Sequence, residues 1–478
     1  MRFAGWIFFA VTVLAAAVWL HGEDKQTNVT KFTGVASACR ISGYAHEIEC
    51  GTLELANEIK DFSPAIDGLR WYRIPARTRY GLPDPVIWIS AFGNDTVERA
   101  PVMAATLKRL LNSRDLIWME PRGTPPAADL ACIPAGIKTL QTLLEPLADA
   151  AVVKRCRDAM RSWAGTAVPP ARQHAMDLER LRIALGISRV NVLAEDNGAE
   201  VAMEWAVIAP AAIRTVALDS PVLTDVSTPE QRALRMASAL RQALASCRQS
   251  EACRSAYPDP LADLQHVRAG LPRTVTIPHP QTGESESVRV TDEILAGMVA
   301  RILRHPPRAG MLPAVLQATA DGDWRPLFGL LAATWSGPDQ TFHWEPWLAA
   351  TCSNDQPQGG SPEDEVAAWF QTSERQQYQR LCDGQLVPPE PKDSPPAGQY
   401  PLLVLQGGAD PVASEAPSNA LVVEAPGGGH GMLAYGCAAD IVYRFVQSAA
   451  MPAGSELGAA CLEQVPYPVP FVERKRSQ

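Results

Sequence analysis

Short buried strands that alternate with amphipathic helices are the feature that most constrains how this chain folds. Apolar runs rich in β-branched or aromatic residues end at Gly, Pro, Asp or Glu, which is typical of strands. These runs are 69–78, 85–90, 115–120, 190–195, 213–219, 401–407 and 420–426. Helical stretches lie between several of them, and in one stretch Leu178, Leu181 and Leu185 repeat at helical spacing. The alternation predicts an α/β fold with a mostly parallel sheet.

The alternation stops in one long interior segment. At 478 residues with 46% hydrophobic content, the chain can bury a large core and has room for one large domain and an insertion. From about Leu223 to Gln399, long helical patterns are followed by proline-rich loops. We therefore expect a core formed by residues 37–222 and 400–473, with a mainly helical insertion at 223–399 between its two parts.

The first residues indicate export. One arginine precedes an apolar stretch that reaches Leu20, which is typical of an export signal. No small-residue cleavage site is clear after Leu20, and the stretch is close to the shortest that spans a bilayer. Residues 1–22 are interpreted as a signal peptide or a membrane anchor, so we expect a periplasmic or secreted protein that meets a membrane only through this segment. The net charge of -9, with no basic run longer than the RKR of the tail, argues against nucleic acid as a partner.

The ten cysteines agree with export. They fall as sequence neighbours into five pairs, with no CxxC motif and no cysteine and histidine at zinc-ligand spacing, so we expect no metal. Nearby thiols form bridges in oxidising compartments, which favours five disulfides over free thiols. The predicted pairs are Cys39 with Cys50, Cys132 with Cys156, Cys247 with Cys253, Cys352 with Cys382, and Cys437 with Cys461.

The turn after the strand at 190–195 has the form of a catalytic elbow. In the hydrolase motif G-x-S-x-G, small residues flank a nucleophile in a tight turn between a strand and a helix. Here Ala194 and Gly198 are the small residues, and Asp196 stands at the serine position. Asp-Asn-Gly is also ordinary turn chemistry, and Asp is a good helix N-cap. The pentapeptide alone therefore favours a structural turn over a catalytic one.

Motifs along nearly the whole chain resemble the tripeptidyl aminopeptidase-like branch of the α/β-hydrolases, which are secreted relatives of proline iminopeptidase. The segments that carry the resemblance are CRISGYAHEIECGTLEL, EPRGTPPAADLACIP, DLERLRIALGISRVNVL, VALDSPV, ASCRQSEACRSAYPDPLADL, PLLVLQGGADPVAS, GGGHGMLAYGC and ACLEQVPYPVPF. The resemblance implies an α/β-hydrolase fold with an inserted helical cap, and no cofactor.

The resemblance also implies a catalytic relay in the chain order nucleophile, acid, base. Asp410, in GGADPV, falls on the family's acid, and His430, in GGGHG, falls on its base. By themselves, a turn-capping aspartate and a loop histidine are common. Their occurrence together, at the family's spacing, favours the catalytic interpretation.

The sequence departs from the family at three places. Asp196 replaces the serine, and residues 90–93 (SAFG) replace the His-Gly-Gly-Pro-Gly segment that supplies an oxyanion N–H group. The segment 413–423 between acid and base is shorter than the family's. The backbone N–H groups of Asn197 and of Phe92 remain the candidate oxyanion donors.

These departures leave three interpretations open. The chain is a non-catalytic descendant whose pocket binds a small molecule or a peptide, with serine-peptidase activity lost. Alternatively, Asp196 is a nucleophile toward an ester-like, epoxide or carbon–halogen substrate, and His430 activates the water that opens the resulting ester. In the third interpretation a hydrolase uses another arrangement, such as Asp196 as a base.

Overall fold

The computed structural model describes ten segments of the chain. They are residues 36–54, 68–124, 131–133, 139–164, 170–223, 229–333, 342–353, 362–382, 400–448 and 450–472. The predicted signal peptide or anchor at 1–22 lies outside the described residues, as do the proline-rich residues 383–399. Among the described residues, no helix combines the length and the apolar character that crossing a membrane requires.

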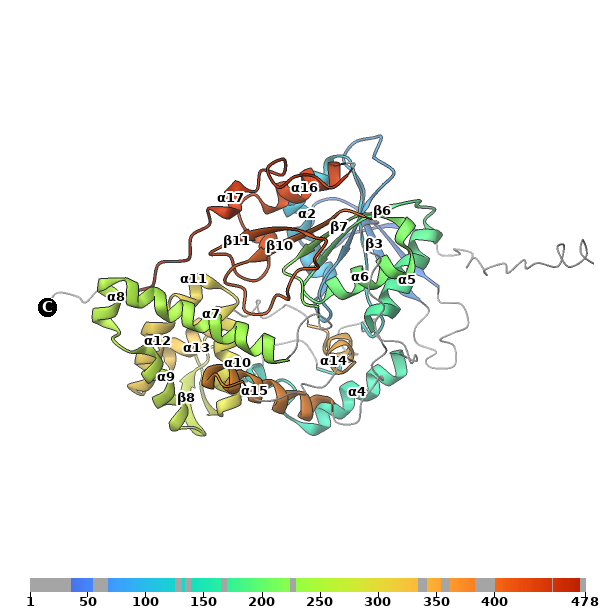
Figure 1. Cartoon of the computed structure of the whole chain (residues 1–478). Helices are drawn as coiled ribbons and strands as arrows, with labels where there is room; N and C mark the ends of the chain where they lie inside the picture. Colours follow the sequence, from blue (N-terminus) through green and yellow to red (C-terminus); the bar gives the residue numbers. More distant parts are fainter. Residues whose placement is uncertain are drawn as a thin grey trace, which may run out of the picture.

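A nine-stranded sheet forms the centre of the described structure (Figure 1). The strands lie in the order β1-β2-β3-β5-β4-β6-β7-β10-β11, and the six from β5 to β11 run parallel. The seven strands predicted from the sequence are confirmed as β3 to β7, β10 and β11. The bounds are β1 Ser37–Cys39, β2 Ile48–Leu53, β3 Leu69–Ile74, β4 Val86–Ile89, β5 Leu116–Met119, β6 Val190–Glu195, β7 Ile213–Asp219, β10 Leu402–Gly407 and β11 Leu421–Ala425.

The parallel strands are mostly apolar because helices cover both faces of the sheet. Successive residues of a strand point to opposite faces, so Trp88 packs toward one face and Ile89 toward the other. Helices α2 (Thr96–Thr106) and α16 (Ala438–Gln447) cover the Trp88 face. Helices α5 (Pro170–Ala184) and α6 (Gly198–Ile208) cover the other (Figure 1). This packing of helices on both faces holds the ends of the strands in fixed positions.

Between β7 and β10 the chain forms a separate apolar core, and we call the described elements from α7 to α15 the cap. Its helices are α7 Pro229–Gln249, α8 Glu251–Ala256, α9 Pro260–Ala269, α10 Asp292–Leu303, α11 Pro306–Ala309, α12 Leu312–Ala320, α13 Arg325–Ala332, α14 Trp344–Cys352 and α15 Glu365–Cys382. The cap also contains an antiparallel hairpin of β8 (Arg273–Pro278) and β9 (Ser285–Val290), which was not expected from the sequence. Alternate residues of these strands, such as Val288 and Val290, are buried in the cap core, so the period-2 signal was present but short.

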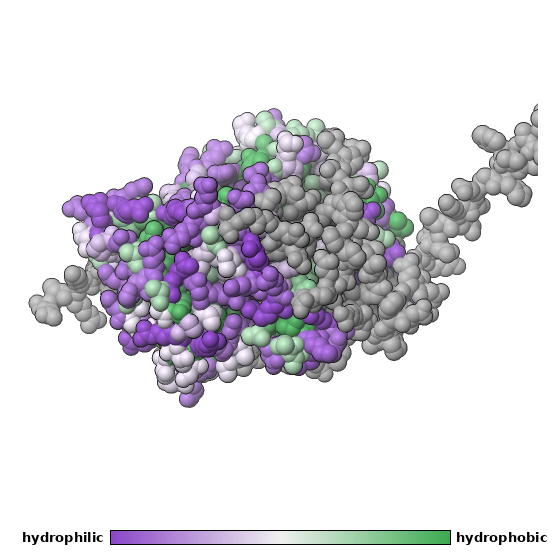
Figure 2. Space-filling model, turned by 60° about the horizontal axis from the view of Figure 1, so that its bottom comes forward, coloured by the Kyte–Doolittle hydropathy of each residue, from purple (hydrophilic) through white to green (hydrophobic). Residues whose placement is uncertain are grey.

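The remaining elements are short connections and edge helices. They are α3 Leu140–Leu144, α4 Ala150–Ala164, α17 Ala460–Glu463, and the 3-10 turns η1 Leu110–Asn112, η3 Pro210–Ala212 and η4 Met432–Ala434. On the face shown in Figure 2, hydrophilic residues predominate, and the apolar residues of its described part lie in small scattered patches.

All five predicted disulfides are present, and they join neighbouring elements. Their Cα–Cα distances run from 4.9 to 6.4 Å, within the range that a bridge spans. The Cys352–Cys382 bridge joins α14 to α15, and the Cys437–Cys461 bridge joins the start of α16 to α17. Five bridges are compatible with the expected oxidising compartment.

Candidate active site

Asp196 lies in a strained turn between β6 and α6. Its backbone has φ of 52°, which non-glycine residues seldom adopt. The Asp196 N–H donates to the Asp219 carbonyl at 3.1 Å, and the Val222 N–H donates to the Asp196 carbonyl at 3.0 Å. Gly198 lies so close to β4 that a Cβ atom there would stand 2.8 Å from the Ser90 carbonyl oxygen. The small residue at the end of the pentapeptide is therefore required by the close approach of two backbones.

The structure brings the three predicted relay residues together. Nδ1 of His430 lies 2.9 Å from Oδ2 of Asp410, and Nε2 lies 3.0 Å from Oδ2 of Asp196. Asp410 follows β10, and its Oδ1 accepts the N–H groups of Val412 and Ala413 at 2.9 and 3.2 Å. Residues 411–420 contain no helix, yet the acid still reaches the histidine. The shortened segment therefore leaves this contact intact.

Strand order, elbow and chain order together decide the fold. The nucleophile position follows a central parallel strand, and the acid and the histidine follow later in the chain, at the same end of the sheet. The chain has the α/β-hydrolase fold.

No protein-family model and no curated protein matches this chain. Solved structures that resemble it include the juvenile hormone epoxide hydrolase from the silkworm Bombyx mori, with 15% identity, 84% of this chain and 78% of that chain covered, and a TM-score of 0.34. The enol-lactonase from Burkholderia xenovorans has 16% identity, 80% and 96% coverage, and a TM-score of 0.31. E-2-(acetamidomethylene)succinate hydrolase has 12% identity, 87% and 100% coverage, and a TM-score of 0.32. Sequence identities and TM-scores this low carry no information on the activity of this chain.

The three relay residues form an ion-paired cluster. Burial opposes the charge of His430, but Asp410 and then Asp196 overcome it and raise the pKa of His430 to about 10. Burial would likewise raise the pKa of Asp196, but the positive His430 and its hydrogen bond lower it to about 2. The pKa of Asp410 is lowered in the same way. At neutral pH the cluster is therefore an imidazolium between two carboxylates.

Both candidate oxyanion donors are engaged within the protein. The Asn197 N–H donates to Oδ1 of Asp196 at 2.7 Å. The Phe92 N–H donates to the side-chain oxygen of Asn197 at 2.9 Å. The sequence offered these two N–H groups as oxyanion candidates, and nothing in it indicated that the Asn197 side chain occupies the Phe92 N–H group. Neither group is open to a new oxyanion in this arrangement.

A buried carboxylate positions the loop that carries His430. Asp219, at the end of β7, accepts the N–H groups of Met432 at 2.6 Å and Leu433 at 3.0 Å. Ser220, the next residue, has φ of 47°, and its hydroxyl accepts the Gly431 N–H at 2.9 Å. Burial and the nearby charge of Glu195 raise the pKa of Asp219 to about 7, against the effect of its two N–H donors.

Glu195 links the elbow to the segment that carries Phe92. Its carboxylate accepts from Trp88 Nε1 at 2.8 Å and from both terminal nitrogens of Arg99 at 3.1 Å. Arg99, from α2, also donates to the Ser90 hydroxyl. These contacts fix residues 90–92 against the turn, which explains why the Asn197 side chain reaches the Phe92 N–H group.

One residue near the cluster, Arg304, comes from the cap and was not expected from the sequence. Nη1 of Arg304 lies 3.8 Å from Oδ2 of Asp196. The backbone carbonyl of Arg304 accepts the backbone N–H of His430 at 3.0 Å. Arg304 ends α10 in a stretch without a recognisable motif, so only the folded chain reveals it. The side chain of Asp410 is fully buried, whereas Asp196 and His430 keep 23% and 14% of their exposure. A ligand can therefore reach Asp196 and His430 but not the acid.

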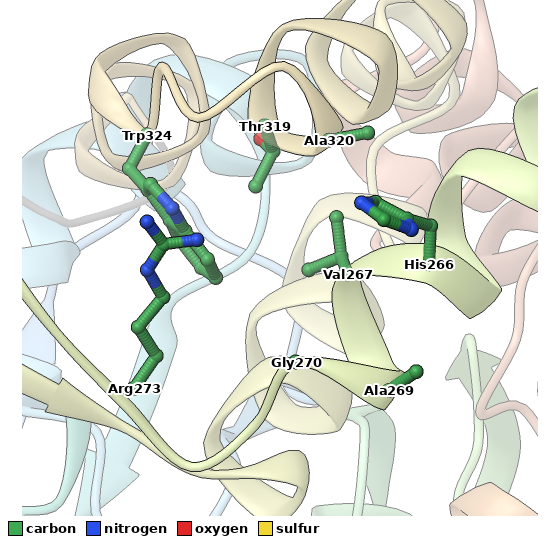
Figure 3. A pocket seen from close by; sticks show the side chains of 8 residues that line it. All are labelled: His266, Val267, Ala269, Gly270, Arg273, Thr319, Ala320 and Trp324. Atoms are coloured by element: carbon green, nitrogen blue, oxygen red, sulfur yellow. The ribbon is translucent and has the colours of Figure 1, made fainter.

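A separate hollow of about 230 Å³ lies inside the cap, between α9, α12 and α13 (Figure 3). His266, Arg273 and Trp324 line it, and all eight of its lining residues belong to the cap. The described residues contain no group of three or more side chains arranged to hold a metal ion.

Proposed function

We propose that this chain is an exported relative of the secreted tripeptidyl aminopeptidases that has lost serine-peptidase activity and binds a small molecule or a peptide at the relay cluster. The α/β-hydrolase fold and the sequence motifs support the relationship, and five disulfides support export. The loss of peptidase activity rests on one observation, the His430 imidazole between two carboxylates.

The ion-paired histidine is a poor general base. A group with a pKa of about 10 is neutral in only about one molecule in a thousand at pH 7. Proton abstraction requires that neutral form, and an effective base titrates near the working pH. Asp196, with a pKa of about 2, is also far too weak a base to replace it. The third interpretation, in which Asp196 is the base, is therefore not favoured.

A carboxylate cannot take over the role of serine on an amide. Serine attack gives an ester that water opens, with the histidine moving the proton. Attack by Asp196 would have to expel an amine and form an anhydride, which is higher in energy than the amide. The engaged N–H groups of Asn197 and Phe92 would also leave the tetrahedral oxyanion without donors.

The test is hydrolysis of a panel of peptide anilides with free N-termini by the purified protein. We expect no release of aniline above the background rate. The matched control is His430→Ala, which is expected to give the same background. Release by the wild-type protein that disappears in His430→Ala would refute the proposed loss of peptidase activity.

A second candidate function is favoured by the way the two oxygens of Asp196 are held. The Asn197 N–H binds Oδ1, whereas His430 contacts Oδ2. If Asp196 attacks a saturated carbon, a carbon–oxygen bond forms and the halide or epoxide oxygen leaves with its electron pair. An epoxide oxygen then takes a proton from solvent. The ester carries no charge, so His430 loses one of its two anionic partners and its pKa falls.

The second step of this candidate then has its base. His430 first releases its proton to solvent as its pKa falls. Water then attacks the carbonyl carbon of the Asp196 ester and gives one proton to His430, the bond between that carbon and the alkoxy oxygen breaks, and the leaving oxygen takes the second proton of the water so that the alcohol departs. One oxygen of Asp196 must come from solvent after each turnover. The test is incubation with epoxides and haloalkanes in heavy-oxygen water, followed by the mass of the peptide that contains Asp196. A mass gain in that peptide, together with an ester trapped in His430→Ala, would establish this function. It would then replace the proposal of ligand binding without turnover.

A further inference from the structure

The last described residues of the chain cross from the core of the sheet to the cap. Residues 465–472 follow α17 and extend without helix or strand toward α8 (Figure 1). Val465 packs against the apolar core of the sheet, whereas Val472 packs against the Cys247–Cys253 bridge of the cap. We call residues 465–472 the strap, because its two ends contact different parts of the fold.

The sequence of the strap makes it stiff. Prolines stand at positions 466, 468 and 470, so each residue from 465 to 470 either is a proline or precedes one. Proline fixes its own φ, and its ring also confines the residue before it to extended conformations. A run of this length spans roughly 19 Å at about 3.1 Å per residue. The strap therefore loses little conformational entropy when it docks, and it can hold a fixed spacing between core and cap.

At its core end the strap docks on the glycine-rich loop that carries His430. The Gly427 N–H donates to the Val465 carbonyl at 2.9 Å. A Cβ atom at Gly427 would clash with the Pro466 carbonyl, so the approach of the two backbones requires glycine at this position. The strap and His430 are therefore attached to the same loop.

At its other end the strap contacts the cap where α11 ends. The Phe471 N–H donates to the Gly310 carbonyl at 3.0 Å. A Cβ atom at Gly310 would stand 3.3 Å from the Val469 carbonyl oxygen, so the two backbones lie close together here as well. Gly310 follows α11 directly. We call residues 304–310, which include α11, the cap corner.

The cap corner also lies against the His430 loop. The Arg304 backbone carbonyl accepts the backbone N–H of His430 at 3.0 Å, and Nη1 of Arg304 lies 3.8 Å from Oδ2 of Asp196. Gly429 packs so closely on Pro306 that a Cβ atom there would clash with the proline ring. The cap corner is therefore held both by the strap and by the loop, and its position sets where Arg304 stands beside Asp196.

The strap lies at the surface and is held by few buried contacts. Val469 is 85% exposed and Phe471 is 45% exposed, so neither side chain buries much apolar area. Segments with few buried apolar contacts open locally at a lower free energy than a core does. The cap and the sheet each have an apolar core of their own. The strap can therefore detach while both parts stay folded.

We propose that the strap holds the cap corner against the His430 loop, and that release of the strap frees the corner and opens Asp196 and His430 to a ligand. Asp196 keeps 23% of its exposure with Arg304 beside it, so movement of the cap corner away from the loop would expose more of the carboxylate. This inference goes beyond the proposed function, because it concerns access to the relay cluster and not what binds there.

The experiment is amide hydrogen exchange of the full chain by NMR, with Phe471→Pro as the variant and Phe471→Ala as its control. Both changes remove the aromatic ring, but only proline removes the N–H that binds Gly310. We expect the His430 amide, which donates to the cap corner, to exchange at least tenfold faster in Phe471→Pro and less than threefold faster in Phe471→Ala. The amides of Met432 and Leu433 donate to Asp219 of the sheet and should keep their rates.

A second variant and a second measurement test access to the site. A chain that ends at Gln464 lacks the whole strap and should show the same acceleration at His430. Labelling with a water-soluble carbodiimide and glycine methyl ester, followed by peptide masses, should modify Asp196 at least fivefold faster in this chain and in Phe471→Pro than in the wild type. The side chain of Asp410 is fully buried and should stay unlabelled. Thermal unfolding of each variant establishes that it is folded.

Four outcomes would overturn the proposal. An unchanged His430 amide in both variants would show that the strap does not hold the cap corner. Equal acceleration at Met432 and Leu433 would show general loosening of the loop, and equal acceleration in Phe471→Ala would assign the effect to the ring. Faster exchange at His430 with unchanged labelling of Asp196 would show that the strap does not control access. Neither measurement needs a ligand or turnover, so cleavage of peptide anilides would refute the proposed loss of peptidase activity and leave this inference standing.

Discussion

Replacing Asp196 by asparagine is expected to lower the pKa of His430 from about 10 to about 7–9. The change removes one of two carboxylates that contact the imidazole, at 3.0 Å, and leaves Asp410 at 2.9 Å. An opposite charge at this distance shifts a pKa by roughly 1–3 units, equivalent to about 1.4–4 kcal/mol. Asparagine adopts positive φ readily, so the turn itself should be preserved.

The sign of the stability change follows from the same shift. His430 has a pKa of about 10 when folded and 6.5 when unfolded, so it stabilises the folded chain below pH 6.5 and loses this effect as pH rises through 10. In Asp196→Asn, this stabilising effect of His430 should already be lost by about pH 7–9. Asp196 acts in the opposite sense, because its stabilising effect is present above pH 3.8 and is lost as pH falls through 2.

The assay is an NMR titration of protein with labelled histidine, in which the spectrum of His430→Gln identifies the His430 signal among eight histidines. Asp440→Asn is the control. It removes a carboxylate that pairs with Arg109, away from the relay cluster, and should leave the pKa of His430 unchanged. A wild-type His430 that titrates between pH 6 and 7, or one that Asp196→Asn does not shift, would refute the ion-paired cluster and with it the argument against peptidase activity.

Two further substitutions test the elbow and the disulfides. Asp196→Ser alone is expected to give at most weak hydrolysis of p-nitrophenyl acetate, whereas Asp196→Ser with Asn197→Ala frees the Phe92 N–H and should raise the rate roughly 100-fold. Equal rates in the two variants would show that the Asn197 side chain is not what blocks this donor. Replacing Cys352 and Cys382 together by alanine should lower the free energy of unfolding by about 3–4 kcal/mol, against about 2 kcal/mol for Cys247 and Cys253, because the closed loops span 30 and 6 residues. Denaturant titration measures both, and the reverse order would contradict the loop-length argument.

The strands could be predicted because their signals are local. Seven apolar runs became seven strands, since burial on both faces of the sheet requires apolar residues in succession. Asp410 and His430 were placed in the relay by the resemblance to a known family, because each alone has the pattern of an ordinary turn or loop residue. In the structure both contact one another and Asp196 at the same end of the sheet.

The parts that could not be predicted depend on side-chain direction. Nothing in the sequence says that the Asn197 oxygen turns toward Phe92, or that Arg304 turns toward a residue more than 100 positions earlier. The β8–β9 hairpin was missed because two short strands with period-2 burial are hard to distinguish from loop between long helices. Such features are set by packing between distant elements, which periodicity does not encode.

The strained turn at Asp196 persists without any need for catalysis, because surrounding contacts fix it. The Asp196 N–H binds Asp219, its carbonyl accepts from Val222, and Gly198 packs against β4. Within that fixed turn, the aspartate carboxylate accepts the Asn197 N–H, and the asparagine oxygen accepts the Phe92 N–H. Two adjacent residues thus convert donors that would stabilise a transition state into hydrogen bonds of the resting protein. Serine chemistry at this turn therefore requires changes at both positions, which is why a single substitution of Asp196 should not produce it.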